Sequence, residues 1–232
     1  MLKIDKLTKS YIDRSGKIRK NVLQEVSFRV TEGKIFWLKG ESGGGKSTII
    51  KILLGLLEYD SGSITYNFQD GTERKYDSFS RDNWQQFRKE VQYISQHPES
   101  FFDPSMILED SIKEIFLIHS ELDKGEKNNR VRMKQLLGEL QLDTALLQRY
   151  PHQLSGGELQ RLALCRVLLL KPRLILMDEP TSMLDDENSE LLYKILNGLN
   201  KQYGVTLLIA SHEQRGIEKL ADQHFDIGLI SK

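Results

Sequence analysis

Short apolar runs alternate along this chain with longer stretches in which apolar residues recur at helical spacing. The runs over 35–38 and 174–177 are apolar throughout, and 205–210 is apolar except for Thr206, as expected of parallel strands that are covered on both faces. Apolar residues recur at helical spacing over 49–56 and 191–199. Strands that alternate with helices predict an α/β fold with a doubly wound, mostly parallel sheet. The ligand of such a sheet lies at the carboxyl ends of its strands.

The N-terminal part of the chain departs from this alternation. Residues 1–35 carry apolar residues at strand spacing, interrupted by an exposed turn over 13–17, and predict an antiparallel β subdomain. A further strand over 64–68 runs toward Asp70-Gly71, a dipeptide that is typical of hairpin turns. The polar stretch 72–90 predicts a surface helix.

The middle of the chain changes to a helical pattern. Apolar residues mark one helix over 107–116 and another over 131–140, with a polar connection over 124–129. We therefore expect a helical subdomain inserted into an α/β domain. The expected division is residues 1–96 and 158–232 for the α/β core with its β subdomain, and about 97–157 for the helical subdomain.

Composition adds little that is specific to function. The chain has 232 residues, 39% of them apolar, and 33 basic residues balance 33 acidic ones, so no global attraction to nucleic acid is implied. The single cysteine, Cys165, excludes an internal disulfide and lies in an apolar run, where we expect it to be a core residue. The N-terminus is charged, unlike a signal peptide, and no apolar run approaches the roughly 18 residues of a membrane span. We expect a soluble chain that would reach a membrane only through a partner.

The most informative motif lies between the apolar run 35–38 and the helix that follows it. Its residues are Gly40, Glu41, Ser42, Gly43, Gly44, Gly45, Lys46, Ser47 and Thr48, which fit the phosphate-binding pattern G-x-x-x-x-G-K-[ST]. The glycines let backbone N–H groups turn toward a phosphate, and the helix N-terminus adds its dipole. Lys46 is expected to reach the β- and γ-phosphates, and the Ser47 hydroxyl to ligate Mg²⁺.

Two acidic residues follow the apolar run 174–177. Asp178 should emerge at the sheet edge beside Ser47, where its carboxylate can hold Mg²⁺. Glu179 is then placed to polarise a water molecule for attack on the γ-phosphate. Together with the phosphate-binding loop, these acids predict a nucleotide hydrolase.

A second loop with a serine and two glycines precedes another predicted helix. Ser155, Gly156, Gly157 and Glu158 place a hydroxyl and a flexible backbone at a helix N-terminus, where an anion can bind. One phosphate-binding loop and a separate anion site suggest that two copies complete each other's pocket. Taken alone, the second loop would only cap a helix.

With these motifs, the sequence strongly resembles the ATP-binding subunits of ABC transporters over essentially its whole length. Residues 40–48 match Walker A, 174–179 match Walker B, and 154–158 match the signature motif with Glu158 in place of the commoner glutamine. Gln96 matches the Q-loop, 182–185 the D-loop and His212 the switch histidine. Tyr11 falls where the family places the aromatic residue that stacks on adenine, although its residue type alone would suggest a half-buried strand residue.

The resemblance implies a head-to-tail dimer that holds two ATP molecules, each between one Walker A loop and the partner's Ser155–Gly157. Glu158 would adjoin that contact. Lys46 would bind phosphates, Ser47, Gln96 and Asp178 would surround Mg²⁺, and Glu179 would act as the general base. His212 would contact the γ-phosphate. Expected partners are a second ATP-binding subunit, transmembrane permease subunits and an external solute-binding protein, but no nucleic acid. The expected location is peripheral, on the cytoplasmic face of the membrane.

Residues 96–104 resemble the Q-D-P-x-x-S-L-N-P stretch of dipeptide, oligopeptide and nickel importers, with departures at His97, Phe101, Phe102 and Asp103. Because the chain lacks the C-terminal extension of many peptide-importer ATPases, nickel or metallophore uptake is slightly favoured. Alternatives are an ABC exporter ATPase, a soluble ABC ATPase acting on ribosomes or DNA, and a small-molecule kinase with the same loop. The second anion site and Glu179 argue against the kinase.

Overall fold

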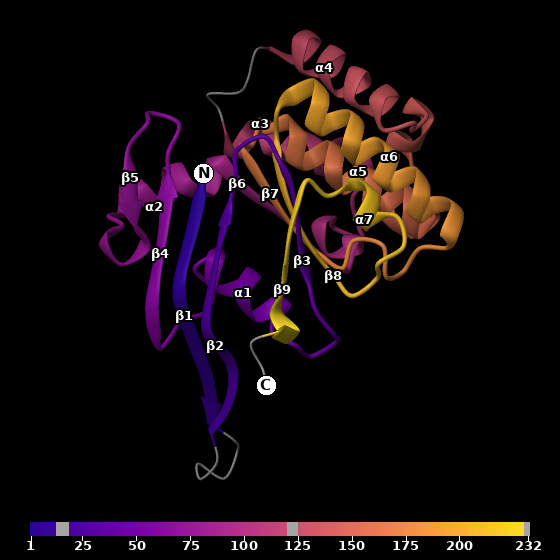
Figure 1. Ribbon diagram of the computed structural model, residues 1–232. Helices are drawn as coiled ribbons and strands as arrows, with labels where there is room; N and C mark the ends of the chain where they lie inside the picture. The colour runs from indigo at the N-terminus through magenta and orange to yellow at the C-terminus, as the bar shows by residue number, and fades with distance from the viewer. Residues whose placement is uncertain (13–18, 120–124, 230–232) are drawn as a thin grey trace.

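The larger of two β-sheets is parallel and lies at the centre of the fold (Figure 1). The structure is a computed structural model that describes residues 1–12, 19–119 and 125–229. Within these residues the sheet contains, in spatial order, β6 (Val91–Ile94), β7 (Leu174–Asp178), β8 (Thr206–Ser211), β3 (Ile35–Lys39) and β9 (Gln223–Asp226). All neighbouring pairs are parallel. The predicted α/β class is confirmed.

Alternate residues of the parallel strands enter two separate hydrophobic cores. In β3, Ile35 and Trp37 belong to the core shared with the helices that follow β6, whereas Phe36 and Leu38 belong to the core beneath the antiparallel sheet. Successive side chains of a strand point to opposite faces of a sheet. Because both faces are covered, each position must be apolar, which explains the uninterrupted apolar runs in the sequence.

The smaller sheet is antiparallel and is built from the N-terminal part of the chain. Its order is β2 (Arg19–Val30), β1 (Leu2–Ile12), β4 (Ser61–Asn67) and β5 (Glu73–Lys75). The predicted hairpin is present: Phe68 N–H donates to Thr72 O at 2.8 Å, and the Asp70 side chain accepts the Thr72 N–H. The expected β subdomain is therefore confirmed, whereas the predicted turn over 13–17 lies outside the described residues.

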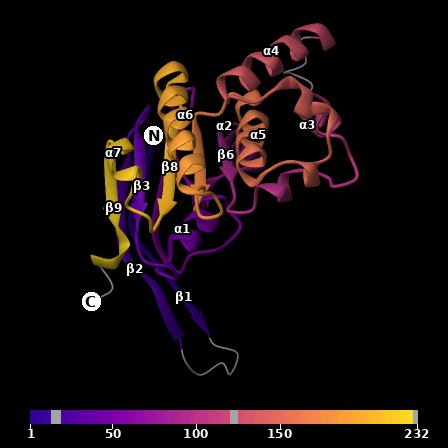
Figure 2. The ribbon, with the colours of Figure 1, turned by 90° about the vertical axis from the view of Figure 1, so that its right-hand side faces the viewer.

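Helices cover both faces of the parallel sheet. Their bounds are α1 (Lys46–Leu53), α2 (Arg81–Glu90), α3 (Leu108–Ile118), α4 (Glu126–Glu139), α5 (Gly156–Leu169), α6 (Asp186–Tyr203) and α7 (Ile217–Leu220). Single 3₁₀ turns lie at Tyr76–Ser78, Pro98–Phe101, Thr144–Gln148, Pro151–Gln153 and Ile227–Leu229. Figure 2 shows α3, α4 and α5 grouped at the β6 end of the sheet, with β9 and α7 at the other end. The stretch between β6 and β7 is helical, as its periodicity predicts.

Several boundaries differ from the sequence predictions. The helix α4 begins at Glu126, inside the stretch predicted as a polar connection, because Lys127 and Asn128 in its first turn are exposed and need not be apolar. For the same reason Val131 is a poor marker of the core, being 60% exposed. The strand β9 ends at Asp226, whose carboxylate accepts the Gly228 N–H at 2.9 Å and turns the chain. In the stretch 72–90, β5 and a 3₁₀ turn precede the expected helix.

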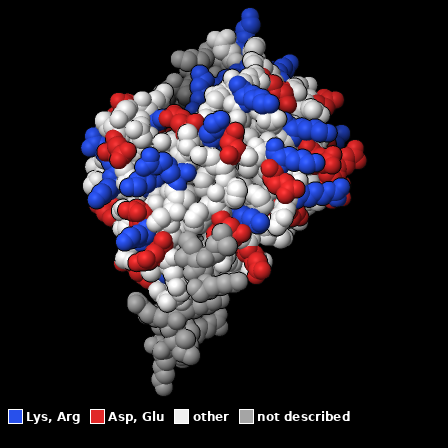
Figure 3. Space-filling view, viewed as in Figure 1, with Lys and Arg blue, Asp and Glu red and all other residues white. Residues whose placement is uncertain are grey.

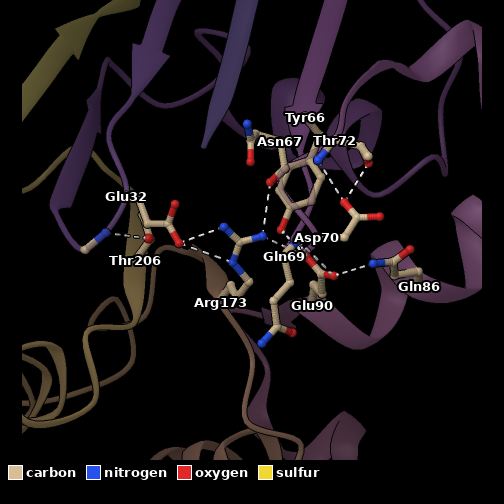
Figure 4. A network of polar contacts seen from close by, with 11 residues as sticks. Glu32, Tyr66, Asn67, Gln69, Asp70, Thr72, Gln86, Glu90, Arg173 and Thr206 are labelled. Carbon is tan, nitrogen blue, oxygen red and sulfur yellow. Dashed lines mark hydrogen bonds and ion pairs between the residues drawn. The ribbon is translucent and has the colours of Figure 1, made fainter.

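A partly buried polar network joins the two sheets at the end opposite the phosphate-binding loop (Figure 4). Arg173, just before β7, lies 3.1 Å from Oε2 of Glu90 at the end of α2. Its other Nη atom lies 2.7 Å from Oε1 of Glu32, in the turn between β2 and β3. The Tyr66 hydroxyl of β4 donates to the same Oε2 of Glu90 at 3.1 Å. Nearby, Thr206 at the start of β8 accepts the Gly33 N–H at 2.9 Å.

The surface carries charges of both signs. On the face shown in Figure 3, Lys and Arg side chains are interspersed with Asp and Glu, so this face has no large area of one sign. Of the helices in the described residues, none is long and apolar enough to span a bilayer.

Candidate functional site

The glycine-rich loop connects β3 to α1 and forms one wall of a cleft. Gly43 and Gly45 have φ of 76° and 98°, in the region that favours glycine. A Cβ on Gly45 would lie 2.8 Å from a methyl carbon of Leu23, so a larger residue would also clash. The Gly44 N–H donates to Glu41 O at 3.1 Å. The loop therefore folds as its glycines predict, and it leads directly into the N-terminus of α1.

Lys46 lies at the base of the loop with only 4% of its surface exposed. Its Nζ donates to the carbonyl oxygens of Gly40 at 2.8 Å and Glu41 at 2.9 Å. The same atom lies 3.1 Å from Oε1 of Glu179. A buried ammonium group needs hydrogen-bond partners and an opposite charge, and these three oxygens supply both.

Four chain segments meet in a cleft of about 230 Å³. The lining residues are Ser42, Gly43, Gly45, Lys46, Ser47, Thr48, Gln96, Glu179, Ser182 and His212. They come from the loop and α1 and from the carboxyl ends of β6, β7 and β8. This is the strand edge that the sequence predicts for the ligand. Residues far apart in sequence but predicted to act together are thus brought together here.

Glu179 has an unusual backbone and two strong partners. Its φ of 48° is left-handed, and its N–H donates to Ala210 O at 2.9 Å. Nδ1 of His212 lies 2.9 Å from Oε2 of Glu179. Burial raises the pKa of this carboxyl, but the hydrogen bonds from His212 and Lys46 outweigh burial and bring the pKa below its ordinary value. Glu179 is therefore a carboxylate, and the Nδ1 of His212 donates to it.

Asp178 precedes it at the end of β7 and is itself buried. Burial raises the pKa of its carboxyl, although a hydrogen bond from the Ser47 hydroxyl opposes the shift. Its Oδ1 atom has no hydrogen-bond partner among the described residues. A buried carboxylate oxygen without a partner, beside a serine hydroxyl, fits a hard divalent cation such as Mg²⁺, which takes one or two carboxylates and otherwise water or phosphate oxygens. Within the described chain no group of three or more His, Cys, Asp or Glu could hold a metal by itself.

The second glycine loop lies away from this cleft. Ser155 is the N-cap of α5 and accepts the Glu158 N–H at 3.3 Å. Oε2 of Glu158 accepts the backbone N–H and the hydroxyl of Ser155, both at 2.8 Å. The bond from the Ser155 N–H is the largest factor that lowers the Glu158 pKa. In the described structure, neither these two residues nor Gly156 and Gly157 line the cleft. The chain therefore does not bring its two predicted phosphate sites together.

Tyr11 also lies outside the cleft. It is on β1, with 39% of its surface exposed and Nζ of Lys9 5.7 Å from its ring centre. An exposed ring on a strand can stack on a base, and Tyr11 is two residues from Lys9, whose strand partner Leu23 adjoins Gly45 of the loop.

The sequence did not predict some of the contacts that residues make in and around the cleft. Ser182 lines the cleft, and its hydroxyl donates to Glu179 O at 3.0 Å. The indole N–H of Trp37 donates to Ser211 O at 3.1 Å, next to His212. The strand pattern places Trp37 in the core but gives no sign of this bond. Such contacts depend on the order of β7, β8 and β3 in the sheet, and the spacing of residues in the sequence does not reveal that order.

A glycine-rich loop that ends at a buried lysine, together with an Asp-Glu pair at the carboxyl end of another strand of the same sheet, defines a P-loop nucleotide hydrolase. The ABC transporter family model matches residues 23–182, and the chain belongs to this family. It is 34% identical over 201 residues to the oligopeptide transport ATP-binding protein OppF of Streptococcus mutans, covering 87% of this chain and 63% of that protein. It is 32% identical over 226 residues to the glutathione import ATP-binding protein GsiA of Escherichia coli, covering 95% of this chain and 35% of that protein. The chain thus spans between about a third and two thirds of the length of these relatives.

Solved structures with the same fold agree. The cassette MJ0796, in a dimeric post-hydrolysis state with ADP and Pi, has a TM-score of 0.81 and 25% identity, covering 97% of this chain and 94% of that one. Another, cbiO1 from Clostridium perfringens, part of the transporter complex cbiONQ, has a TM-score of 0.78 and 25% identity, covering 97% of this chain and 83% of that one. The likeness extends over nearly the whole chain, so the α/β core and the helical region both belong to the cassette fold.

Proposed function

We propose that this chain binds and hydrolyses ATP and thereby powers a membrane ABC importer. The observation that carries this proposal is the convergence of Lys46, Glu179 and His212 in one cleft beneath the glycine-rich loop. The cleft has a buried cation for phosphate, an ionised carboxylate for a water molecule and a histidine bonded to that carboxylate. These are the groups that hydrolysis of a terminal phosphate requires.

We assign the following roles to the chain's own residues. The loop amides and Lys46 bind the phosphates, and Ser47, Gln96 and Asp178 hold Mg²⁺, which neutralises phosphate charge when it is bound. The orphaned Oδ1 of Asp178 supports this assignment. Glu179 accepts a proton from the attacking water, and His212 orients Glu179 and reaches toward the γ-phosphate. Tyr11 is proposed to stack on adenine.

The location of the second glycine loop supports a composite site. Because Ser155–Gly157 do not line the chain's own cleft, we propose that they meet the phosphates bound by a partner cassette in a head-to-tail dimer. Glu158 would adjoin that contact. The similar cassette MJ0796 is described as dimeric with its nucleotide. The partner is either a second copy or a different, homologous chain.

A groove in the helical region is the surface that we propose for the permease. About 530 Å³ in size, it is lined by Met106, Asp110, Lys113, Glu114, Phe116, Leu117, Asn129, Arg130 and Met133. Leu117 is 82% exposed, and Ile118 beside it is also exposed. Exposed apolar side chains next to a groove with a polar rim are typical of protein interaction sites. We propose that residues of about 97–157 form the subdomain that transmits ATP binding to the permease, with the chain peripheral on the cytoplasmic membrane face.

The imported solute is proposed to be a peptide or a small peptide derivative. This proposal rests on the similarity to an oligopeptide transport ATP-binding protein and a glutathione import ATP-binding protein. An external solute-binding protein would deliver it. Nickel uptake remains a prediction from the sequence alone.

The decisive experiment compares Glu179→Gln with the exposed control Glu187→Gln. The wild type and Glu187→Gln should hydrolyse ATP, whereas Glu179→Gln should bind ATP without turnover and elute as a dimer in size-exclusion chromatography with ATP. If the partner is a different chain, it must be included. Near-normal hydrolysis by Glu179→Gln would remove Glu179 from the role of base, and absence of ATP binding to the wild type would contradict the proposed function.

The permease surface has its own test. Leu117→Asp should prevent reconstitution with the transmembrane permease subunits while leaving ATP binding intact. Leu56→Asp, at an exposed leucine outside the groove, is the matched control. Equal loss of assembly in both variants would contradict the assignment of the groove.

A further inference from the structure

A second bridge joins the two loops that carry Glu179 and His212. The hydroxyl of Thr181 lies 3.1 Å from Oε2 of Glu213 and 3.2 Å from the hydroxyl of Tyr193 on α6. Thr181 is only 1% exposed. It follows Glu179 by two residues, and Glu213 directly follows His212. The bridge therefore connects the same two loops as the Glu179–His212 contact, from the side away from the cleft.

The chemistry of the three groups fixes the direction of the hydrogen bonds. A Glu213 carboxylate can only accept, so the single hydroxyl proton of Thr181 is donated to it. The Tyr193 hydroxyl must then donate to Thr181. Burial is the main factor that raises the pKa of Tyr193, so its phenol keeps the proton that this arrangement needs. A chain of hydrogen bonds that ends on a carboxylate in a poorly hydrated site holds its members firmly.

Glu179 needs such support because its backbone is in the left-handed region, with φ 48°. A non-glycine residue in that region is strained and persists when its surroundings fix it. The Glu179 N–H bonds to Ala210 and its carbonyl accepts from Ser182. Both contacts hold Glu179 itself. The Thr181 bridge, in contrast, connects the Glu179 loop to Glu213, the residue after His212.

We propose that Thr181 is a positioning residue for ATP hydrolysis, and that its hydroxyl, bonded to Glu213, holds the side chains of Glu179 and His212 in their relative positions. The inference rests on the proposed function, since these positions matter for catalysis only if the two side chains act on a bound nucleotide. Thr181 touches neither nucleotide nor water in this scheme. It acts through the two loops.

The test replaces Thr181 by valine, which removes the hydroxyl and keeps nearly the same side-chain shape. In Thr181→Val, kcat for ATP should fall about tenfold or more, as small misplacements of reacting groups do, while KM changes less than about twofold. Thr181→Ser should restore kcat. The matched control is Thr206→Val, which removes another fully buried hydroxyl acceptor at the opposite end of the sheet. It should lower the melting temperature comparably and leave kcat unchanged.

A double variant and a readout without hydrolysis complete the test. Thr181→Val combined with Glu213→Ala should be no slower than the slower single variant, because both remove one bridge. Histidine Cε1–H resonances, with His212 assigned from His212→Gln, should show a shifted His212 signal in Thr181→Val but not in Thr206→Val. An unchanged His212 signal, or equal kcat values for Thr181→Val and Thr206→Val, would overturn the inference. A wild type without ATPase activity would instead contradict the proposed function. The His212 signal alone would then show whether the Thr181–Glu213 bond positions His212.

Discussion

The ammonium group of Lys46 lies 3.1 Å from Oε1 of Glu179, and both side chains are largely buried. Lys46, which is proposed to bind phosphate, and Glu179, which is proposed to accept a proton from water, therefore form an ion pair in the cleft. A bound nucleotide would have to replace Glu179 as the partner of Lys46, which would free Glu179 to accept a proton.

Lys46→Ala should weaken ATP binding by at least tenfold, because it removes the buried cation of the phosphate site. Isothermal titration calorimetry with ATP and Mg²⁺ measures this directly. Lys51→Ala, on the same helix but exposed and outside the cleft, should bind like the wild type. Unchanged affinity in Lys46→Ala would count against the phosphate site described above.

Asp178→Asn should stabilise the folded chain while reducing its Mg²⁺-dependent affinity for ATP. The buried Oδ1 of Asp178 has no partner among the described residues, so removing the charge removes a desolvation cost. A gain of about 1 kcal/mol would raise Tm by roughly 2–4 °C in a chain of this size. Scanning calorimetry with EDTA, against the exposed control Asp5→Asn, measures the gain.

The pH dependence of that gain has a definite sign. Burial raises the folded-state pKa of Asp178 above its ordinary value of 3.8, so the folded state binds the proton more tightly than the unfolded state does. Stability therefore falls as pH rises from the ordinary value through the raised one. The advantage of Asp178→Asn should be full at neutral pH and vanish in acid. An advantage that grows toward acid would contradict this explanation.

Arg173→Ala should destabilise the fold by roughly 3 kcal/mol, the low end of the range for breaking a buried ion pair. The low end is expected because Tyr66 and Gln86 still donate to Glu90. Arg215→Ala removes an ion pair to Asp186 in which both side chains are exposed and should cost less than about 1 kcal/mol. Urea unfolding of the two variants compares them, and equal costs would show that the network in Figure 4 does not brace the sheets.

Cys165 should be inert in the folded chain. It is fully buried in α5, and burial raises the pKa of its thiol to about 12, so the reactive thiolate is scarce at pH 8. Ellman's reagent should react with it only as the chain unfolds, in step with loss of circular dichroism. Rapid modification of the native chain would show that this core opens locally.

The sequence was sufficient for the parts of the fold that repeat a pattern. Apolar runs located β3, β7 and β8, and the glycine spacing located the loop that encloses Lys46. The start of α4 at Glu126 and the end of β9 at Asp226 were not predictable, because a polar first turn and a side-chain bond leave no periodic signal. Boundaries set by single contacts escape a periodicity argument.

The candidate site followed the same division. Motif order named Lys46, Asp178, Glu179 and His212, but the spacing could not show that Lys46 and Glu179 form an ion pair. Nor could it show the bond from Thr181 to Glu213, because the two residues lie 32 positions apart on loops that only the parallel sheet brings together. Long-range contacts of this kind follow from strand order, which the residue pattern leaves open.

Trp37 gives this protein an internal fluorescent probe. Its buried indole bonds to the carbonyl of Ser211, directly before His212, and Nζ of Lys39 lies 5.3 Å from its ring. Indole emission responds to hydrogen bonding and to nearby charge. The chain has only one other tryptophan, Trp84, so a Trp84→Phe variant would have a single emitter, bonded to the residue before His212. Movement of His212 on nucleotide binding could then be followed in real time by stopped-flow spectroscopy, without an attached dye.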